Sequence, residues 1–142
     1  MILLDANILL YAFDASSPRH DASRGWLERT LSGSEVVGFP LVTILAFIRI
    51  GTDPRVFDAP LDTESAIEIV STWLARPNAQ LVEPTARHWQ VLAAVSGKGR
   101  ARGPTVTDAH LAALAIEHGA TLCTTDRGFG RFHDVETLDP TA

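Results

Sequence analysis

The sequence predicts an α/β fold, a three-layer sandwich with a mostly parallel sheet of short strands. Short apolar runs without polar alternation recur along the chain, which is typical of strands buried on both faces. Longer segments with helical spacing of apolar residues separate these runs, and this alternation favours a doubly wound parallel sheet. The chain has 142 residues, of which 46% are apolar, so it can bury one core, and we expect a single domain over residues 1–142.

The first half of the chain is expected to contribute two strands and four helices. Residues 1–5 form an apolar run that ends in an acid, and residues 35–39 form a second predicted strand. The helices are expected over residues 6–13, 18–31, 41–50 and 62–75. Pro18 suits a first helical turn, and Asp62 suits an N-cap. The helix over residues 41–50 is apolar nearly all round, so we expect it to be buried.

The second half is expected to contribute three strands and two helices. The strands are predicted over residues 79–82, 120–124 and 135–138, with a short turn over 128–132 before the last. The helices are predicted over residues 85–95 and 105–118, separated by a loop rich in Gly and Arg over 97–103. Gly119 is placed to end the second of these helices. In such folds ligands gather at the carboxyl ends of the strands, which is where chemistry is expected.

Composition excludes several classes of protein. The net charge of −5 argues against a protein that coats nucleic acid without regard to sequence, because such proteins need a basic surface. The single cysteine, Cys123, excludes a disulfide framework and a zinc site built on cysteines, and its place within a predicted strand suggests a buried, inert thiol. No apolar run is long enough to cross a membrane and no leader pattern opens the chain, so we expect a cytoplasmic protein without membrane contact.

Three acids from distant parts of the sequence are expected at one edge of the sheet. Asp5 and Asp126 directly follow predicted strands, and Asp108 lies in the first turn of the helix over residues 105–118. Carboxylates that converge without partners repel one another, and a bound divalent cation would relieve this. Carboxylates without His or Cys suit Mg²⁺ or Mn²⁺.

Each of these acids also has an ordinary structural interpretation. Asp5 could cap a helix, Asp126 with Gly128 could form a turn, and Asp108 follows Thr105 at the spacing of a capping box. The five histidines lack metal-ligand spacing, and His110 is expected to be a surface or helix-end residue. Arg100 and Arg102 could bind phosphate, although such residues more often belong to a solvated loop.

Three sequence motifs resemble the PIN-domain family. They are LLDAN at residues 3–7, TDAHLAALA at 107–115 and LCTTD at 122–126. The size and the order of elements resemble the VapC-type toxins of this family, which are the ribonuclease halves of bacterial type II toxin–antitoxin pairs. The resemblance covers essentially the whole chain.

The resemblance implies a Mg²⁺-dependent endoribonuclease that hydrolyses RNA through metal-activated water. Asp5, Asp108 and Asp126 match the family's catalytic and metal-binding acids, and Asn7 and Thr125 are expected to support them by hydrogen bonds. Mn²⁺ is expected to substitute for Mg²⁺. The resemblance also implies a cognate antitoxin, bound in a groove of the second to fourth helices, and assembly as a homodimer or as a hetero-oligomer with that antitoxin.

Two positions depart from the family pattern. Phe47 stands where a glutamate is usual, and Gly128 stands where a further acid often follows the last one. We expect Phe47 to face the edge of the site, and the two departures leave open whether one or two metal ions bind. They also leave a second function open, a catalytically weakened PIN-like module that acts by binding RNA or a partner. Receiver-like and dehalogenase-like phosphotransfer domains fit less well, because Lys98 follows a helix and position 7 is Asn.

Overall fold

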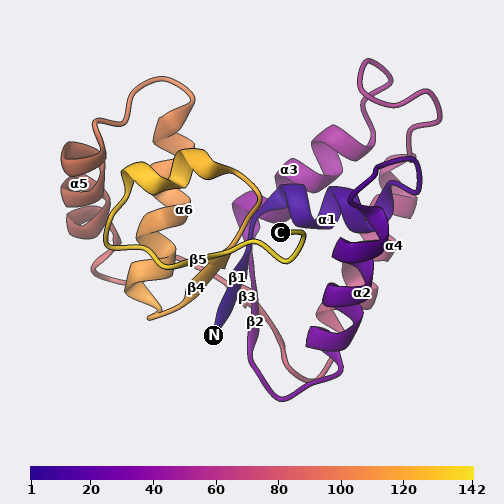
Figure 1. Ribbon diagram of the computed structural model, residues 1–142, viewed down its shortest axis with the longest axis horizontal. Helices are drawn as coiled ribbons and strands as arrows, with labels where there is room; N and C mark the ends of the chain where they lie inside the picture. The colour runs from indigo at the N-terminus through magenta and orange to yellow at the C-terminus, as the bar shows by residue number, and fades with distance from the viewer.

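The computed structural model describes residues 1–142 and contains one sheet of five parallel strands (Figure 1). The strands are β1 (Ile2–Leu4), β2 (Val37–Pro40), β3 (Ala79–Val82), β4 (Thr121–Cys123) and β5 (Thr137–Leu138). Their order across the sheet is β3-β2-β1-β4-β5, and every neighbouring pair is parallel. The predicted α/β class is therefore confirmed, with β1 at the centre of the sheet.

Six α-helices and one short 3-10 helix connect the strands. They are α1 (Ala6–Phe13), α2 (His20–Leu31), α3 (Leu41–Gly51), α4 (Thr63–Leu74), α5 (His88–Gly99), α6 (Thr105–Glu117) and the 3-10 helix η1 (Arg127–Arg131). The caps expected from the sequence are present: Asp62 accepts from the Ser65 N–H at 2.7 Å, and Gly119 follows α6 with φ +60°. The helix predicted over residues 85–95 is displaced, because Thr85 bonds to Glu117 instead of starting the helix, and Gly97 and Gly99 remain helical.

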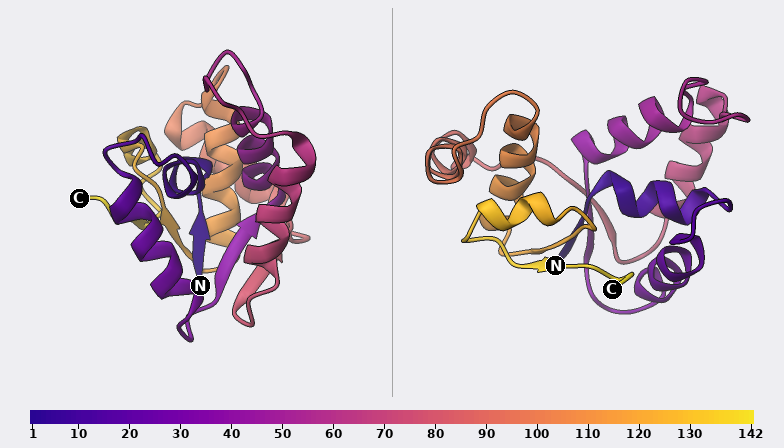
Figure 2. Two further views of the ribbon diagram at one scale, coloured as in Figure 1. Left: turned by 90° about the vertical axis from the view of Figure 1, so that its right-hand side faces the viewer. Right: turned by 45° about the horizontal axis from the view of Figure 1, so that its top comes forward.

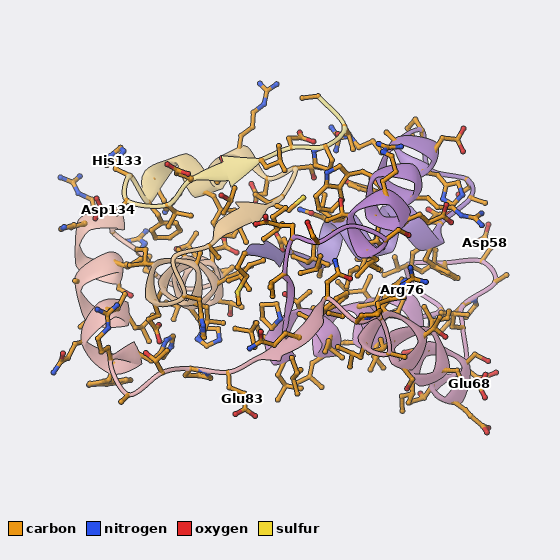
Figure 3. The ribbon with its side chains drawn as sticks, turned by 90° about the horizontal axis from the view of Figure 1, so that it is seen from below. Asp58, Glu68, Arg76, Glu83, His133 and Asp134 are labelled. Atoms are coloured by element: carbon orange, nitrogen blue, oxygen red, sulfur yellow. The ribbon has the colours of Figure 1, made fainter.

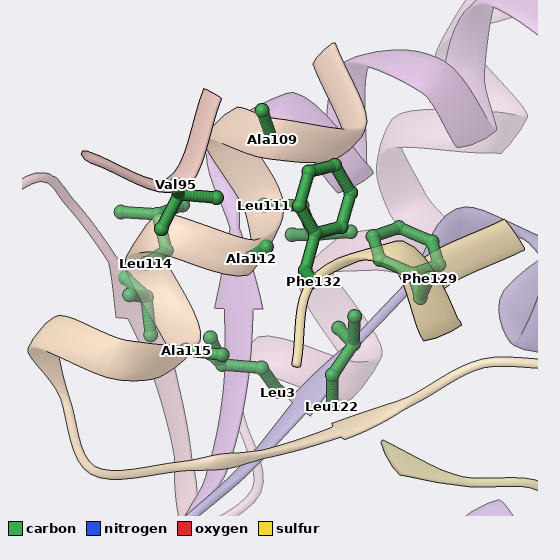
Figure 4. Close-up of a cluster of buried hydrophobic side chains, with 11 residues drawn as sticks. Leu3, Val95, Ala109, Leu111, Ala112, Leu114, Ala115, Leu122, Phe129 and Phe132 are labelled. Atoms are coloured by element: carbon green, nitrogen blue, oxygen red, sulfur yellow. The ribbon is translucent and has the colours of Figure 1, made fainter. Parts of the chain in front are cut away.

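The helices cover the two faces of the sheet as separate groups. Helices α5 and α6 pack on one face and α1 to α4 on the other (Figures 1 and 2). Leu3 and Leu4 of β1 point to opposite faces, since side chains alternate along a strand. Leu3 belongs to the apolar cluster with α5, α6 and η1, which Figure 4 shows, and Leu4 belongs to the cluster with α1 to α4. Two cores therefore fix β1 between them.

Helix α3 is buried on one side only, which corrects the expectation of full burial. Leu41 and Leu45 are 51% and 56% exposed, whereas Phe47 is fully buried. The Phe47 ring lies between Phe13 and Trp73, with centroid distances of 6.2 and 5.1 Å. Phe47 therefore packs into the core with α1 and α4, and the prediction that it faces the edge of the site is wrong.

The carboxyl ends of the strands meet the amino ends of several helices at one edge. Helix α1 begins directly after β1, η1 follows β4, and the amino end of α6 lies at the same edge (Figure 2). No helix combines the length and the apolar character needed to cross a bilayer. The acids predicted from the sequence all belong to the segments that meet at this edge.

Candidate active site

Asp5 is held at the junction of β1 and α1. Its N–H donates to the Cys123 carbonyl at 3.0 Å, which extends the pairing of β1 with β4 by one residue. Its side chain caps α1, with Oδ1 accepting from the Ala6 N–H at 2.7 Å. Asp5 is thus a helix cap, as one interpretation of the sequence suggested, and the cap involves only its Oδ1 atom.

The hydroxyl of Thr124 links three other residues of the edge. It donates to Oδ2 of Asp5 at 2.7 Å and accepts from the side-chain amide of Asn7 at 3.2 Å and from the Asp126 N–H at 3.0 Å. One donor and two acceptors are all that a hydroxyl offers, so its hydrogen-bonding capacity is fully used. Thr124 is only 3% exposed, so these bonds are shielded from water.

Sequence reasoning singled out Asn7 and Thr125 as supporting residues and missed Thr124. Asn7 lies where expected, because its amide also donates to Oδ2 of Asp5 at 3.3 Å. Thr125 contributes a backbone N–H, which donates to Oδ1 of Asn7 at 3.5 Å, and its side chain makes no hydrogen bond. The signal for Thr124 is its place directly after β4, one residue beyond the register partner of Leu4.

Asp126 caps the 3-10 helix η1. Its Oδ1 accepts from the Gly128 N–H at 2.8 Å, so the turn expected from the sequence is present. A Cβ added to Gly128 would lie 2.9 Å from this oxygen, closer than real Cβ contacts allow. An acidic side chain at position 128 would therefore require Asp126 to move, which is a physical reason for glycine there.

The side chain of Asp108 makes no hydrogen bond to any protein group, although its backbone belongs to α6. The capping-box interpretation is wrong, because Thr105 instead exchanges hydrogen bonds with the backbone of Arg102, each at 2.8 Å. Burial raises the pKa of Asp108, the charges of Asp126 and Asp5 raise it further, and Arg131 opposes them. The structure thus brings Asp108 into the electrostatic neighbourhood of the other two acids.

The negative charge at this edge is poorly compensated. Burial raises the pKa of Asp5, the hydrogen bonds from Thr124 and Ala6 lower it, and the charge of Asp126 raises it again, with a net rise. No three His, Cys, Asp or Glu side chains are gathered closely enough in the structure to enclose a metal ion. The three acids therefore share one edge of the sheet without enclosing a common point.

A half-buried chain of polar side chains connects α5 to α6. His88 Nδ1 contacts Oε2 of Glu117, and His88 Nε2 lies 2.9 Å from His110 Nδ1. The N–H and hydroxyl of Thr85 donate to Oε1 of Glu117 at 2.9 and 2.7 Å. His110 is therefore not a free surface residue as the sequence suggested, and burial together with His88 lowers its pKa.

Comparison with known proteins identifies the family. The PIN domain family model matches residues 2–135. Ribonuclease VapC37 of Mycobacterium tuberculosis is 46% identical over 142 residues, which cover 100% of this chain and 99% of the relative. Two solved structures have similar folds, each with a TM-score of 0.67.

The first of these structures is VapBC2 from Rickettsia felis bound to a promoter DNA fragment, at 21% identity with 97% of this chain and 98% of that chain covered. The second is Mycobacterium tuberculosis VapC20, a toxin that cleaves the sarcin–ricin loop, at 15% identity with 92% and 93% covered. Sequence and fold agree over nearly the whole length, and the chain belongs to the PIN-domain family.

Proposed function

We propose that this protein is a Mg²⁺-dependent endoribonuclease and the toxin component of a type II toxin–antitoxin system. The observation that carries the proposal is the set of three carboxylates at the carboxyl edge of the sheet, in which Asp108 has no protein partner and its pKa is raised. The curated relative VapC37 is named a ribonuclease, which supports the same activity.

The donor set fits a hard divalent cation. All three candidate ligands are carboxylates, and oxygen ligands of this kind suit Mg²⁺ and Mn²⁺. Asp5 and Asp108 would hold the ion, and Asp126 would hold a water or a second ion. When bound, the ion would stabilise charge on the phosphate and lower the pKa of a water molecule.

The chain's own residues have distinct tasks in this proposal. Thr124 and Asn7 orient Oδ2 of Asp5, while the amino end of α1 holds Oδ1. No histidine or lysine is hydrogen-bonded to the three acids, so the candidate site offers carboxylates and not the histidine pair or lysine that typically deprotonates a ribose 2′-hydroxyl. We therefore expect water to be the nucleophile, with 5′-phosphate and 3′-hydroxyl products.

A cleft between α2 and α4 is the candidate site for the antitoxin. Its volume is about 340 Å³, and Leu27, Leu31 and Trp73 supply its apolar lining. Arg76 lies between the two helices (Figure 3), with its guanidinium bonded to the Leu31 carbonyl at 3.3 Å. Such a cleft suits the apolar face of a partner helix. A homodimer or a hetero-oligomer with the antitoxin is part of the proposal.

The function is tested with purified protein and an RNA oligonucleotide carrying one deoxyribose at the cleavage position. Cleavage with Mg²⁺ or Mn²⁺ should persist, should give 5′ ends that can be ligated, and should stop with EDTA or with Asp108→Asn. A 2′,3′-cyclic phosphate product, or activity in EDTA, would contradict the roles given to the three acids.

A second candidate function is a weakened PIN-like module that binds RNA or a partner without turnover. Gly128 favours it, because it supplies no carboxylate after Asp126, whereas Phe47 is a buried core residue and carries no information about the site. RNA binding by wild-type protein without cleavage in either metal would support this function over the first.

A further inference from the structure

Arg100 occupies a backbone conformation that favours glycine. It is the only non-glycine residue with a positive φ, at φ 52° and ψ 46°. This left-handed region is disfavoured for residues with a Cβ, and such outliers persist where the surrounding structure or the function requires them.

The end of α6 provides an internal comparison for Arg100. At the end of α5 the Ala101 N–H bonds to the Ser96 carbonyl at 3.0 Å, and at the end of α6 the Ala120 N–H bonds to the Ala115 carbonyl at 2.8 Å. Both bonds are typical of the Schellman motif that ends a helix. In this motif the residue immediately before the donating N–H is usually glycine. Helix α6 has Gly119 there, with φ +60°, whereas α5 has an arginine.

The side chain of Arg100 makes no contact that stabilises the fold. It is exposed and makes no hydrogen bond or ion pair within the chain. Nearby Lys98 differs, because its ammonium lies 3.3 Å from Asp134, a residue visible beside the end of α5 in Figure 3. Arg102 is also exposed and has no carboxylate partner.

The loop that carries Arg100 and Arg102 is fixed to the candidate active site at two points. Thr105 bonds to the backbone of Arg102, three residues before Asp108 on the same helix. A Cβ on Gly99 would lie 2.5 Å from the Phe132 ring and 3.5 Å from the Arg131 carbonyl oxygen, so the end of α5 abuts the end of η1.

These contacts bring the loop with Arg100 and Arg102 next to the segment that carries Arg131. The positive charge of Arg131 lowers the pKa of Asp108, and Gly99 next to Arg100 touches the segment that carries Arg131. The α5–α6 loop rises above η1 at the same edge of the molecule (Figures 1 and 2). Arg100, Arg102 and Arg131 form no ion pair within the chain, so these neighbouring segments carry unpaired positive charge although the net charge of the chain is −5.

RNA phosphates approaching three carboxylates are repelled unless cations lie nearby. Arginine binds phosphate through two parallel N–H donors and keeps its charge at all physiological pH values. We propose that Arg100, together with Arg102 and Arg131, forms a phosphate-binding surface that positions the RNA backbone beside the acids. This inference rests on the proposed ribonuclease function and assigns these arginines to binding and not to catalysis.

The decisive variant is Arg100→Gly, because it relieves the backbone conformation at position 100 and at the same time removes the positive charge. The first change should not lower stability, and the second should weaken RNA binding. Glycine suits the backbone, so the melting temperature should stay unchanged or rise. Loss of the cation should weaken RNA binding, measured in EDTA so that no cleavage occurs, and should reduce the slope of log K against log salt by about one. In the cleavage assay KM should rise with little change in kcat.

Two further variants separate charge from backbone effects. Arg100→Lys keeps the charge and should retain most of the salt dependence of RNA binding. Arg100→Gln keeps the backbone strain but removes the charge, so the contribution of position 100 to that salt dependence should be lost. Arg87→Ala, at the other end of α5, removes an exposed arginine away from the acids and should leave binding unchanged.

The outcomes distinguish this inference from the proposed function. If wild-type protein cleaves RNA and Arg100→Gly and Arg100→Gln bind RNA with wild-type affinity and salt slope, the phosphate-binding role is wrong and the ribonuclease function stands. If Asp108→Asn abolishes cleavage while RNA binding still depends on Arg100, both are supported. Wild-type protein that neither binds nor cleaves RNA overturns both.

Discussion

The hydroxyl of Thr124 donates to Oδ2 of Asp5 at 2.7 Å, although the two residues are 119 positions apart in sequence. The bond joins the ends of β1 and β4 at the point where both strands deliver an acid to the same edge. Because Thr124 also accepts from Asn7 and from the Asp126 N–H, one buried hydroxyl sets the positions of the first and last acids together. The geometry of the candidate site therefore depends on a residue that is not itself an acid.

We expect Thr124→Val to damage the site at nearly constant side-chain volume. It leaves Oδ2 of Asp5 and the Asp126 N–H short of a partner, which should lower the free energy of unfolding by about 1–3 kcal/mol. Misplacement of Asp5 should reduce RNA cleavage by about 10–100-fold. Urea unfolding and cleavage rates measure the two effects. Thr125→Val is the matched control, and equal losses in both variants would contradict the central role of Thr124.

Asp108→Asn should stabilise the metal-free protein. The pKa of Asp108 is raised in the folded state above its usual 3.8, so the folded protein binds more protons there than the unfolded chain. Ionisation of Asp108 consequently lowers stability as the pH rises through and above 3.8, and the amide variant escapes this loss. The melting temperature in EDTA should exceed that of wild type at pH 7, and the difference should shrink toward pH 4.

The same variant should lose Mn²⁺ binding. Calorimetric titration at pH 7 measures the loss, with Asp58→Asn, an exposed acid in the loop between α3 and α4, as the control. Unchanged Mn²⁺ binding in both Asp108→Asn and Asp5→Asn would show that the metal-ligand assignment is wrong.

Phe47→Glu and Ala46→Glu should behave oppositely. Phe47 is fully buried between Phe13 and Trp73, so a charge there should cost several kcal/mol and unfold the protein. Ala46 follows Val42 by one helical turn, and Val42 packs against the cluster of α6. A glutamate at position 46 therefore projects from the side of α3 that faces α6.

We expect Ala46→Glu to fold and to tighten Mn²⁺ binding. Circular dichroism and calorimetric titration measure the two properties. A folded Phe47→Glu variant with tighter metal binding would restore the sequence-based assignment of Phe47 to the edge of the site.

Cys123 should resist alkylation in the folded protein. Its thiol is fully buried, and burial, with smaller effects of Asp139 and Asp5, raises its pKa to about 12. At pH 8 only about one thiol in 10,000 is then ionised, and the thiolate is the reactive form. Labelling with iodoacetamide, followed by mass spectrometry, should proceed only as fast as unfolding. Rapid labelling in native buffer, with circular dichroism unchanged, would contradict this burial.

The elements whose signals are local were predictable from the sequence. The bounds of α1 and β3 and the amino end of α6 agree with the sequence pattern, as do the caps at Asp62 and Gly119. Hydrophobic period, capping residues and glycine positions act within one or two turns of chain, so a sequence records them directly. The family motifs likewise predicted Asp5, Asp108 and Asp126 as the candidate site acids.

The tertiary structure alone decided which side chains meet. Thr124 and not Thr125 supports Asp5, because successive residues at the end of a strand point to opposite sides. Phe47 and not Ala46 enters the core, because one position along a helix turns a side chain by about 100°. His110 finds His88 and Arg100 comes to lie near Arg131 only because α5 packs against α6 and η1. Such contacts depend on how distant elements pack, and that information is spread over the whole sequence.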